Sequence, residues 1–162
     1  MLSKRGVNVL RGIHTVHIDS KNRLAIPNRY RELLTTRSNN NLVITVDIEA
    51  PCLLIYPEAD WLEIEQQLMS LPAFQAGVRD IQRLLVGHAL DVTLDRHGRV
   101  LISSMLKDYA QLSKAAILVG QGKKLELWDS STWFAHCKRW READHNLSLL
   151  EVHDPQIKNI IL

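Results

Sequence analysis

One stretch of this chain occurs twice. Residues 11–34 align with residues 87–110 without a gap, at a constant spacing of 76 positions. Four residues are identical at that spacing: Val16 and Val92, Asp19 and Asp95, Arg23 and Arg99, and Ile26 and Ile102. The shared pattern predicts a strand, an Asp-x-x-x-Arg turn, a second strand and a short helix. Because a fixed internal period is typical of a duplicated structural unit, this repeat constrains the fold more than composition does.

Each copy of the repeat continues in the same way. In the first copy, strand-like runs at 42–48 and 52–56 follow the short helix, and the corresponding runs of the second copy lie at 115–119 and 125–128. Both copies then end in an aromatic residue and the start of an amphipathic helix. The sequence therefore predicts an α+β protein built from two β-β-α-β-β halves, each followed by a helix of its own.

These patterns divide the chain into four segments. They are a first half with its helix at 9–71, a linking helix at 72–86, a second half with its helix at 87–143 and a C-terminal tail at 144–162. Within the first half, Pro27 opens the short helix, which is predicted over 27–34 and followed by a polar loop over 35–41. Helical periodicity predicts two longer helices, over 57–71 and about 73–86.

The two Asp-x-x-x-Arg turns carry the same conformational signals. An Asp that opens a turn accepts hydrogen bonds from backbone N–H groups further along it, and it can pair with the Arg that follows. Asn22 in the first turn and Gly98 in the second occupy the same position, and both tolerate a positive φ. We therefore expect one turn geometry in both halves, with Asp19, Asp95, Gly98 and Arg99 as structural turn residues.

The positive charge of the chain is concentrated at its N-terminal end. The first 41 residues hold eight lysines and arginines against two carboxylates, whereas the remainder holds twelve against sixteen. A basic end on an acidic body favours a surface that faces a polyanion, although a solvated basic face without a partner has the same composition. The first turn favours nucleic acid, because a hairpin tip with Arg, Lys and Asn can enter the major groove.

We expect six residues of the first half to bind double-stranded DNA. They are Arg11, Lys21, Asn22, Arg23, Arg29 and Arg31. Arg23 and Asn22 are suited to reading guanine and adenine, whereas Lys21 and the two helix arginines are suited to holding phosphates. The alternative for the first turn is a self-capped hairpin whose surface ion pair contributes little stability. For the second turn this structural reading is preferred, so Arg99→Ala is expected to harm folding or assembly more than DNA contact.

The sequence gives little support to other chemistry. Two cysteines 85 residues apart exclude a multi-cysteine zinc site and a disulfide scaffold, so we expect Cys52 and Cys137 to be buried thiols in a reducing cytoplasm. Trp61 and Trp133 are expected to anchor the core rather than to stack on bases. We expect no metal, no cofactor, no small-molecule substrate and no membrane span, and the lack of a paired nucleophile, acid or base argues against an enzyme.

Five stretches of the chain form an ordered set of motifs. They are LRG at 10–12, DSKNRLAIPNRYRELL at 19–34, PCLLIYPEADW at 51–61, RLLVGHALDVTLDRHGR at 83–99 and LVGQGKKLELWDSSTW at 118–133. In order and spacing, these stretches resemble the MraZ family of bacterial transcriptional regulators. The resemblance implies an AbrB-like swapped-hairpin fold, in which the two halves of one chain interleave their strands into a barrel with flanking helices.

The resemblance also implies a function and an assembly. Family members form rings of several subunits and bind repeated short sites in the promoter of the division and cell wall gene cluster. They repress or modulate that cluster in the cytoplasm and nucleoid. In the family the first Asp-x-x-x-Arg turn, here Asp19 and Arg23, is tied to DNA binding. The alternative is an AbrB-like oligomeric interaction protein, antitoxin-like, without specific DNA readout.

The first residues depart from the pattern of the family that the chain resembles. Members usually begin with Met, a hydrophobic residue, one further residue and Gly, and here Val9, Leu10, Arg11 and Gly12 occupy those places. We expect translation to start at Val9 through a GUG codon. The intact mass of the native protein would then correspond to a chain without residues 1–8.

Overall fold

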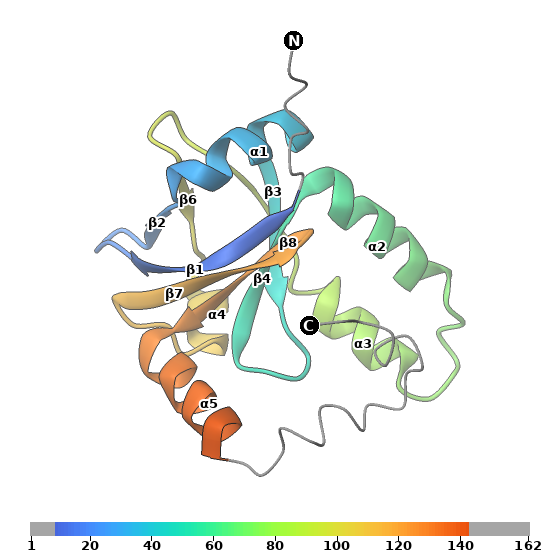
Figure 1. Cartoon of the computed structure of the whole chain (residues 1–162). Coiled ribbons are helices and arrows are strands. Elements are labelled where there is room, and N and C mark those ends of the chain that lie inside the picture. Colours follow the sequence, from blue (N-terminus) through green and yellow to red (C-terminus); the bar gives the residue numbers. More distant parts are fainter. Residues whose placement is uncertain (1–8, 143–162) are drawn as a thin grey trace, which may run out of the picture. The chain divides into compact units, whose positions relative to one another are not determined.

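The computed structural model describes residues 9–142. The first copy of the repeat supplies β1 (Leu10–His17), β2 (Arg23–Ala25), α1 (Asn28–Ser38), β3 (Asn41–Val46), β4 (Cys52–Pro57) and α2 (Glu58–Ser70). Helix α3 (Val78–Leu85) links the copies. The second copy supplies β5 (Leu90–Thr93), β6 (Arg99–Leu101), α4 (Ser104–Tyr109), β7 (Ala115–Gly122), β8 (Lys124–Asp129) and α5 (Ser130–Glu142). Both copies thus have the predicted order of elements (Figure 1).

The chain divides into two compact units at the start of α5. Residues through Ser130 form the first unit, and the residues from Ser131 onward belong to the second. Within α5, the Trp140 ring meets the rings of Trp133 and His136 edge to face, with centroids 5.7 and 5.2 Å apart. The strands and helices α1 to α4 all belong to the first unit.

Strands from the two copies share one antiparallel sheet. Its order is β1-β7-β8-β4-β3-β5. The first strand of each copy pairs with the third strand of the other copy, β1 with β7 and β5 with β3, so each half completes the sheet of the other. Exchanging the two copies leaves this order unchanged. Among the described strands, β1 and β5 form the two edges, so the sheet is open and the predicted closed barrel is not confirmed.

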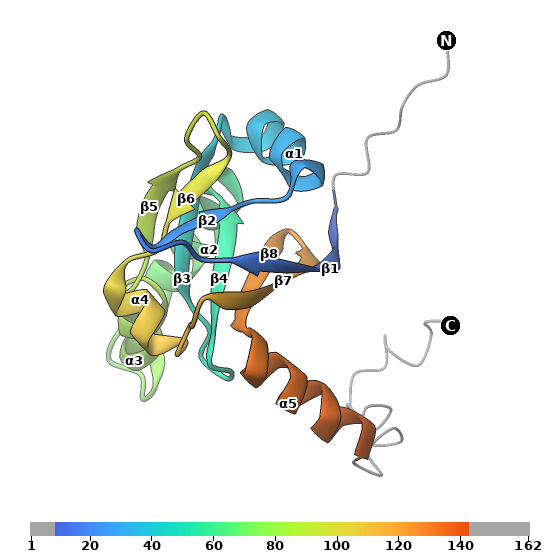
Figure 2. The same ribbon diagram turned by 90° about the vertical axis from the view of Figure 1, so that its left-hand side faces the viewer.

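Strands β2 and β6 form a second, two-stranded antiparallel sheet, with one strand from each copy. Figure 2 shows this pair beside the larger sheet, where β2 follows β1 and β6 follows β5. Leu24 of β2 and Val100 of β6 are opposite one another and buried in the main hydrophobic cluster. These two side chains therefore anchor the small sheet on the core.

Continuous apolar runs place the inner strands in that core. β3 reads NLVITV and β4 reads CLLIYP, and apart from the first residue of β3 every residue of the two strands is buried. Ile44, Leu53 and Ile55 have no exposed surface. Burial of each such side chain contributes about 1.5–3 kcal/mol, so these strands form a stable base for the small sheet.

The predicted end of the first short helix is wrong. Helix α1 continues through Ser38, over much of the segment predicted as a polar loop at 35–41. The hydroxyl side chains of Thr35, Thr36 and Ser38 fit a helix, because each donates to the carbonyl four residues earlier. Asn39 and Asn40 end the helix with φ angles of 51° and 67°, which asparagine tolerates better than most residues.

The linking helix is shorter than predicted. It begins at Val78 rather than near residue 73, because Gly77 directly before it has a φ of 82°, outside the range of a right-handed helix. The prediction of a helix over 57–71 is confirmed to within one residue at each end, since α2 covers Glu58–Ser70.

Both tryptophans are buried, but only one of the cysteines is. Trp61 is 3% exposed and Trp133 is 7% exposed. Cys52 is buried in β4, whereas Cys137 is only half-buried. Cys137 lies on α5, where Trp133 is the buried side chain and the polar residues that follow the cysteine are exposed. The expectation of a buried thiol is therefore wrong for this residue.

Some predictions concern residues outside the described range, namely the start at Val9 that would omit residues 1–8 and the tail at 144–162. Within residues 9–142, no helix is long and apolar enough to cross a membrane. The same residues include no group of three or more His, Cys, Asp or Glu side chains that could hold a metal ion.

Candidate nucleic-acid interface

The first Asp-x-x-x-Arg turn is organised by the carboxylate of Asp19. Its Oδ1 accepts hydrogen bonds from the backbone N–H groups of Lys21 and Arg23, each at 2.9 Å. Its Oδ2 accepts a further bond from Arg23 Nε, also at 2.9 Å. Asn22 has a φ of 58°, which reverses the chain. The predicted turn geometry and the predicted pairing of Asp with Arg are both confirmed.

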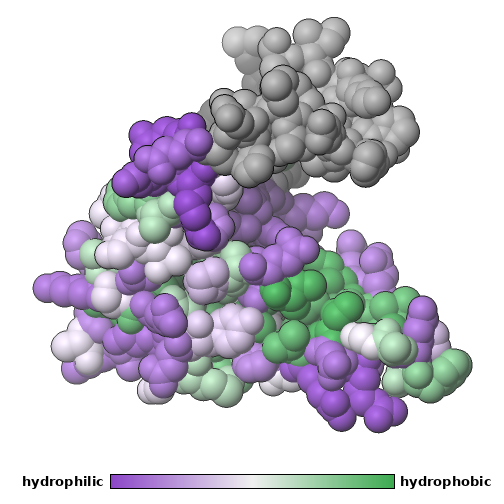
Figure 3. All heavy atoms as spheres, turned by 90° about the horizontal axis from the view of Figure 1, so that it is seen from below, coloured by the Kyte–Doolittle hydropathy of each residue, from purple (hydrophilic) through white to green (hydrophobic). Residues whose placement is uncertain are grey.

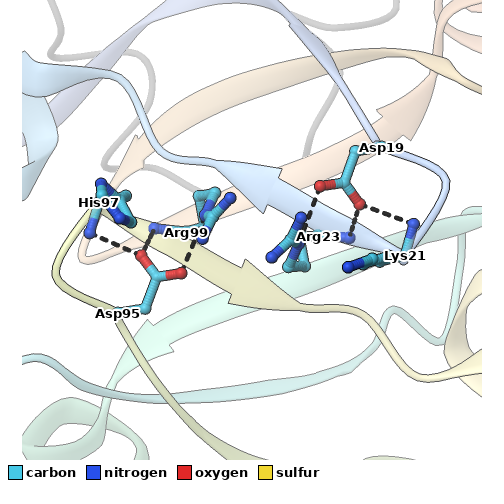
Figure 4. Close-up of polar contacts among 6 residues, drawn as sticks. All are labelled: Asp19, Lys21, Arg23, Asp95, His97 and Arg99. Atoms are coloured by element: carbon cyan, nitrogen blue, oxygen red, sulfur yellow. Dashed lines mark hydrogen bonds and ion pairs between the residues drawn. The ribbon is translucent and has the colours of Figure 1, made fainter.

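The second turn repeats this arrangement. Asp95 Oδ1 accepts from the backbone N–H groups of His97 at 2.8 Å and Arg99 at 2.9 Å, and Oδ2 accepts from Arg99 Nε at 2.9 Å (Figure 4). Gly98 has a φ of 70°. The backbone N–H of Arg99 contributes most to holding the pKa of the Asp95 carboxyl at about 2. The corresponding bond from Arg23 lowers the pKa of Asp19. Both carboxylates are therefore ionised at neutral pH.

Both turns lie on the small two-stranded sheet of β2 and β6, which is called the ribbon below. In the register of β2 and β6, Arg23 is opposite Leu101 and Ala25 is opposite Arg99. Because the pair Leu24 and Val100 between them points into the core, the other four side chains lie on the outer face. Figure 4 shows Arg23 and Arg99 side by side on this ribbon, each turned toward the Asp of its own turn.

Each turn also receives a cation from the opposite half. Arg31 of α1 donates from Nε to the carbonyl of Ile26 at 2.6 Å and packs on Gly98 of the second turn. Lys107 of α4 donates from Nζ to Asn22 Oδ1 of the first turn at 3.0 Å. Lys107 is the repeat counterpart of Arg31. Each half therefore supplies a cation to the turn of the other half, just as each half supplies a strand to the sheet of the other.

The structure does not bring all six predicted DNA-binding residues together. Lys21, Asn22 and Arg23 form the first turn, whereas Arg31 lies beside the second. Arg11 and Arg29 line a separate hollow of about 280 Å³ at the start of β1.

Arg11 and Arg29 are held in that place by Tyr30. The guanidinium of Arg29 lies 5.6 Å from the centre of the Tyr30 ring, and the Tyr30 hydroxyl donates to the Arg11 carbonyl at 2.7 Å. This hollow, which is lined by residues of the first half, and the ribbon, which takes one strand from each half, are two distinct basic regions.

Sequence reasoning missed Lys107, which contacts the first turn directly. Its position in the repeat, 76 residues after Arg31, was the available signal. The sequence analysis instead grouped Arg31 with the residues of the first turn, because it follows them closely in the chain. The side-chain oxygen of Asn22 accepts from Lys107, so this side chain has a role in joining the halves as well as any role toward a ligand.

Comparison with known proteins supports the repeat and identifies the family. The model described as "MraZ protein, putative antitoxin-like" matches residues 9–84 and again residues 85–148. A protein of Hydrogenovibrio crunogenus named "Transcriptional regulator MraZ" is 51% identical over 125 residues, which cover 77% of this chain and 82% of the relative.

Two further relatives bear the same name. The protein of Legionella pneumophila (strain Corby) is 47% identical over 140 residues, which cover 86% of this chain and 92% of the relative. The protein of Coxiella burnetii (strain Dugway 5J108-111) is 48% identical over 132 residues, which cover 82% of this chain and 87% of the relative. The chain therefore belongs to the MraZ family of transcriptional regulators.

Proposed function

We propose that this MraZ-family regulator binds double-stranded DNA sequence-specifically through its first turn. The observation that supports this most is the way Asp19 holds Arg23. The ion pair uses Nε of the guanidinium, whose side chain is 33% exposed, and leaves the two terminal nitrogens for another acceptor. A guanidinium fixed in this way is suited to the O6 and N7 atoms of guanine, because its orientation is set before binding.

The residues around Arg23 have supporting roles in this proposal. Lys21 is exposed at the tip of the turn and is suited to a phosphate. Asn22 keeps its side-chain amide beside Lys107, which adds a positive charge to the turn. Arg31, together with Arg11 and Arg29 at the start of β1, provides further phosphate contacts. Asp19, Asp95, Gly98 and Arg99 hold the two turns in shape.

We propose that several subunits act together as a ring on repeated promoter sites. The first unit exposes large apolar side chains on α2 and the α2–α3 connection: Leu62 at 53%, Met69 at 55%, Leu71 at 45% and Phe74 at 91%. Figure 3 shows apolar side chains gathered on part of the face seen from below. Exposed apolar surface of this kind supports self-association. A ring that presents several turns to tandem sites would gain avidity without new contacts.

The regulatory target and the finer fold also belong to this proposal. By resemblance to the family, the regulated genes are the division and cell wall cluster, and the protein is located in the cytoplasm on the nucleoid. The exchange of strands between the halves supports a swapped-hairpin fold. The proposal is of a binding protein without metal or cofactor, not of an enzyme.

The test is fluorescence anisotropy with two duplexes, the DNA upstream of the chain's own gene and a scrambled duplex of equal composition. Wild type should prefer the native duplex, and Arg23→Ala should reduce that preference about 5–150-fold, as expected for loss of a bidentate base contact. Lys21→Ala should weaken binding to both duplexes equally.

The control for these variants is Arg79→Ala, which removes an exposed arginine from α3, away from the ribbon in Figures 1 and 2. It should bind as wild type does. Equal affinity of wild type for the two duplexes would contradict the proposal. With assembly intact by light scattering, that result would favour the antitoxin-like interaction protein.

A further inference from the structure

We infer that the outer face of the β2–β6 ribbon, including the second turn, is one continuous DNA-binding surface. Arg99 and Arg96 of the second turn contact DNA as Arg23 and Lys21 of the first turn do, and Leu101 contacts an apolar base edge. This inference rests on the proposed function, because it extends the same interface to the second half of the chain.

The ribbon has the right size to place both arginines in one groove. Arg23 and Arg99 lie diagonally across the two strands, two residues apart along the ribbon and on neighbouring strands. With a rise of about 3.3 Å per residue and a spacing of about 4.8 Å between strands, their Cα atoms are roughly 8 Å apart. A two-stranded ribbon fits the major groove, which is about 12 Å wide. Both guanidinium groups can therefore reach base edges of one site.

The second turn has the same geometry for contacting DNA as the first turn. Arg99 engages Asp95 through Nε, as Arg23 engages Asp19, and its side chain is 30% exposed against 33% for Arg23. Nothing in this geometry separates a reading turn from a structural one. The two arginines have the same fixed orientation and the same terminal nitrogens available to a ligand.

The surroundings of the second turn are strongly basic. Arg96 is exposed at its tip, and together with Arg31 it lines a hollow of about 230 Å³ beside Asp95. The Asp95 carboxylate already pairs with Arg99, so three arginines face one carboxylate. The excess of positive charge suits a phosphate of the DNA backbone at this end of the ribbon.

Leu101 makes the outer face more than a basic patch. It is 59% exposed and lies directly opposite Arg23, and Ala25 is likewise exposed and opposite Arg99. Each arginine is thus paired across the ribbon with an apolar side chain. Apolar side chains contact the methyl group of thymine, which the major groove displays. The pairing is what a surface that reads guanine beside thymine would present.

The test is fluorescence anisotropy on Arg96→Ala, Arg99→Ala and Leu101→Ser, with Arg23→Ala for comparison and Arg79→Ala as the charge-matched control. The probes are the native upstream duplex and its scrambled counterpart over a series of salt concentrations. Light scattering and urea unfolding check assembly and stability. Arg96→Ala and Leu101→Ser change exposed side chains, so they remain informative if Arg99→Ala fails to fold.

We expect distinct results from the three variants. Arg99→Ala should lose preference for the native duplex by at least about fivefold, as Arg23→Ala does. Arg96→Ala should weaken binding to both duplexes and reduce the slope of log Kd against log salt by about one unit. Leu101→Ser should weaken binding to the native duplex severalfold and leave binding to the scrambled duplex unchanged.

Two different failures are distinguishable in this experiment. If Arg23→Ala loses the preference while Arg96→Ala, Arg99→Ala and Leu101→Ser bind as wild type does, the second turn is not a contact and the proposed function stands. If wild type has no preference for the native duplex, the proposed function fails. An unchanged salt slope in Arg96→Ala on the scrambled duplex would then also overturn the inference.

Discussion

Substitution of Gly98 by Ala tests how the second turn is joined to the first half. Gly98 has a φ of 70°, and an added Cβ would lie 2.1 Å from Arg31 Nε and 2.3 Å from its Cζ. Arg31 would have to move, and its bond of 2.6 Å to the Ile26 carbonyl would be lost. The control is Gly122→Ala, since Gly122 has a φ of 79° and an added Cβ there would meet nothing within 4 Å.

The expected cost of Gly98→Ala has two parts. A left-handed backbone at an alanine costs about 1–2 kcal/mol. Loss of a hydrogen bond from a charged donor costs about 1.5–3 kcal/mol. Gly98→Ala should therefore reduce the free energy of unfolding by about 2.5–5 kcal/mol, whereas Gly122→Ala should reduce it by the backbone part alone, about 1–2 kcal/mol.

Urea unfolding followed by circular dichroism measures both values, and the double variant with Arg31→Ala separates the two parts. In the Arg31→Ala background, Gly98→Ala should cost no more than Gly122→Ala does in wild type. Equal costs for Gly98→Ala and Gly122→Ala in the wild-type background would refute the reasoning. That result would mean that the contact between Arg31 and the second turn contributes no stability.

Three further predictions concern stability and reactivity. Because the pKa of Asp95 is held at about 2, below its ordinary value of 3.8, the stability that its carboxylate contributes is present above about pH 4 and is lost as the pH falls toward 2. The urea midpoint of wild type should therefore fall over that range, and the midpoint of Asp95→Asn should fall less steeply. Arg37→Ala leaves the Asp60 carboxylate, 8% exposed, without its ion-pair partner, and should lower the free energy of unfolding by about 3–5 kcal/mol in urea titrations. Burial raises the pKa of the Cys52 thiol, so iodoacetamide should alkylate half-buried Cys137 first in native protein, as read by peptide mass spectrometry; equal rates would count against the core packing.

The turns could be predicted from the sequence because their signals are local. Asp19 and Asn22 lie within four residues of each other, and the carboxylate and the positive φ together determine the turn. The recurrence of both signals at Asp95 and Gly98 predicted the second turn in the same way. Burial of Trp61 followed from the helical periodicity of α2 for the same local reason.

The exchange of contacts between the halves could not be predicted, because it depends on strand pairing. Antiparallel pairing of β2 with β6 places α1 over the second turn, so Arg31 lies beside Gly98 and not beside Asn22, its nearer neighbour in sequence. Lys107 reaches the first turn for the same reason. The polar residues after position 34 led to the wrong prediction of a loop, because their hydroxyl groups donate hydrogen bonds to backbone carbonyls of the same helix.

The most direct test of sequence reading by the first turn is the specificity ratio of Arg23→Lys, the Kd for scrambled DNA divided by the Kd for native DNA. Lysine keeps the charge but lacks the planar fork that matches guanine. Two backbone N–H groups still bind Asp19, so the turn is retained. We expect the ratio to fall about tenfold or more while the slope of log Kd against log salt stays unchanged. A ratio equal to that of wild type would show that Arg23 contributes charge alone, which would contradict base reading through this turn.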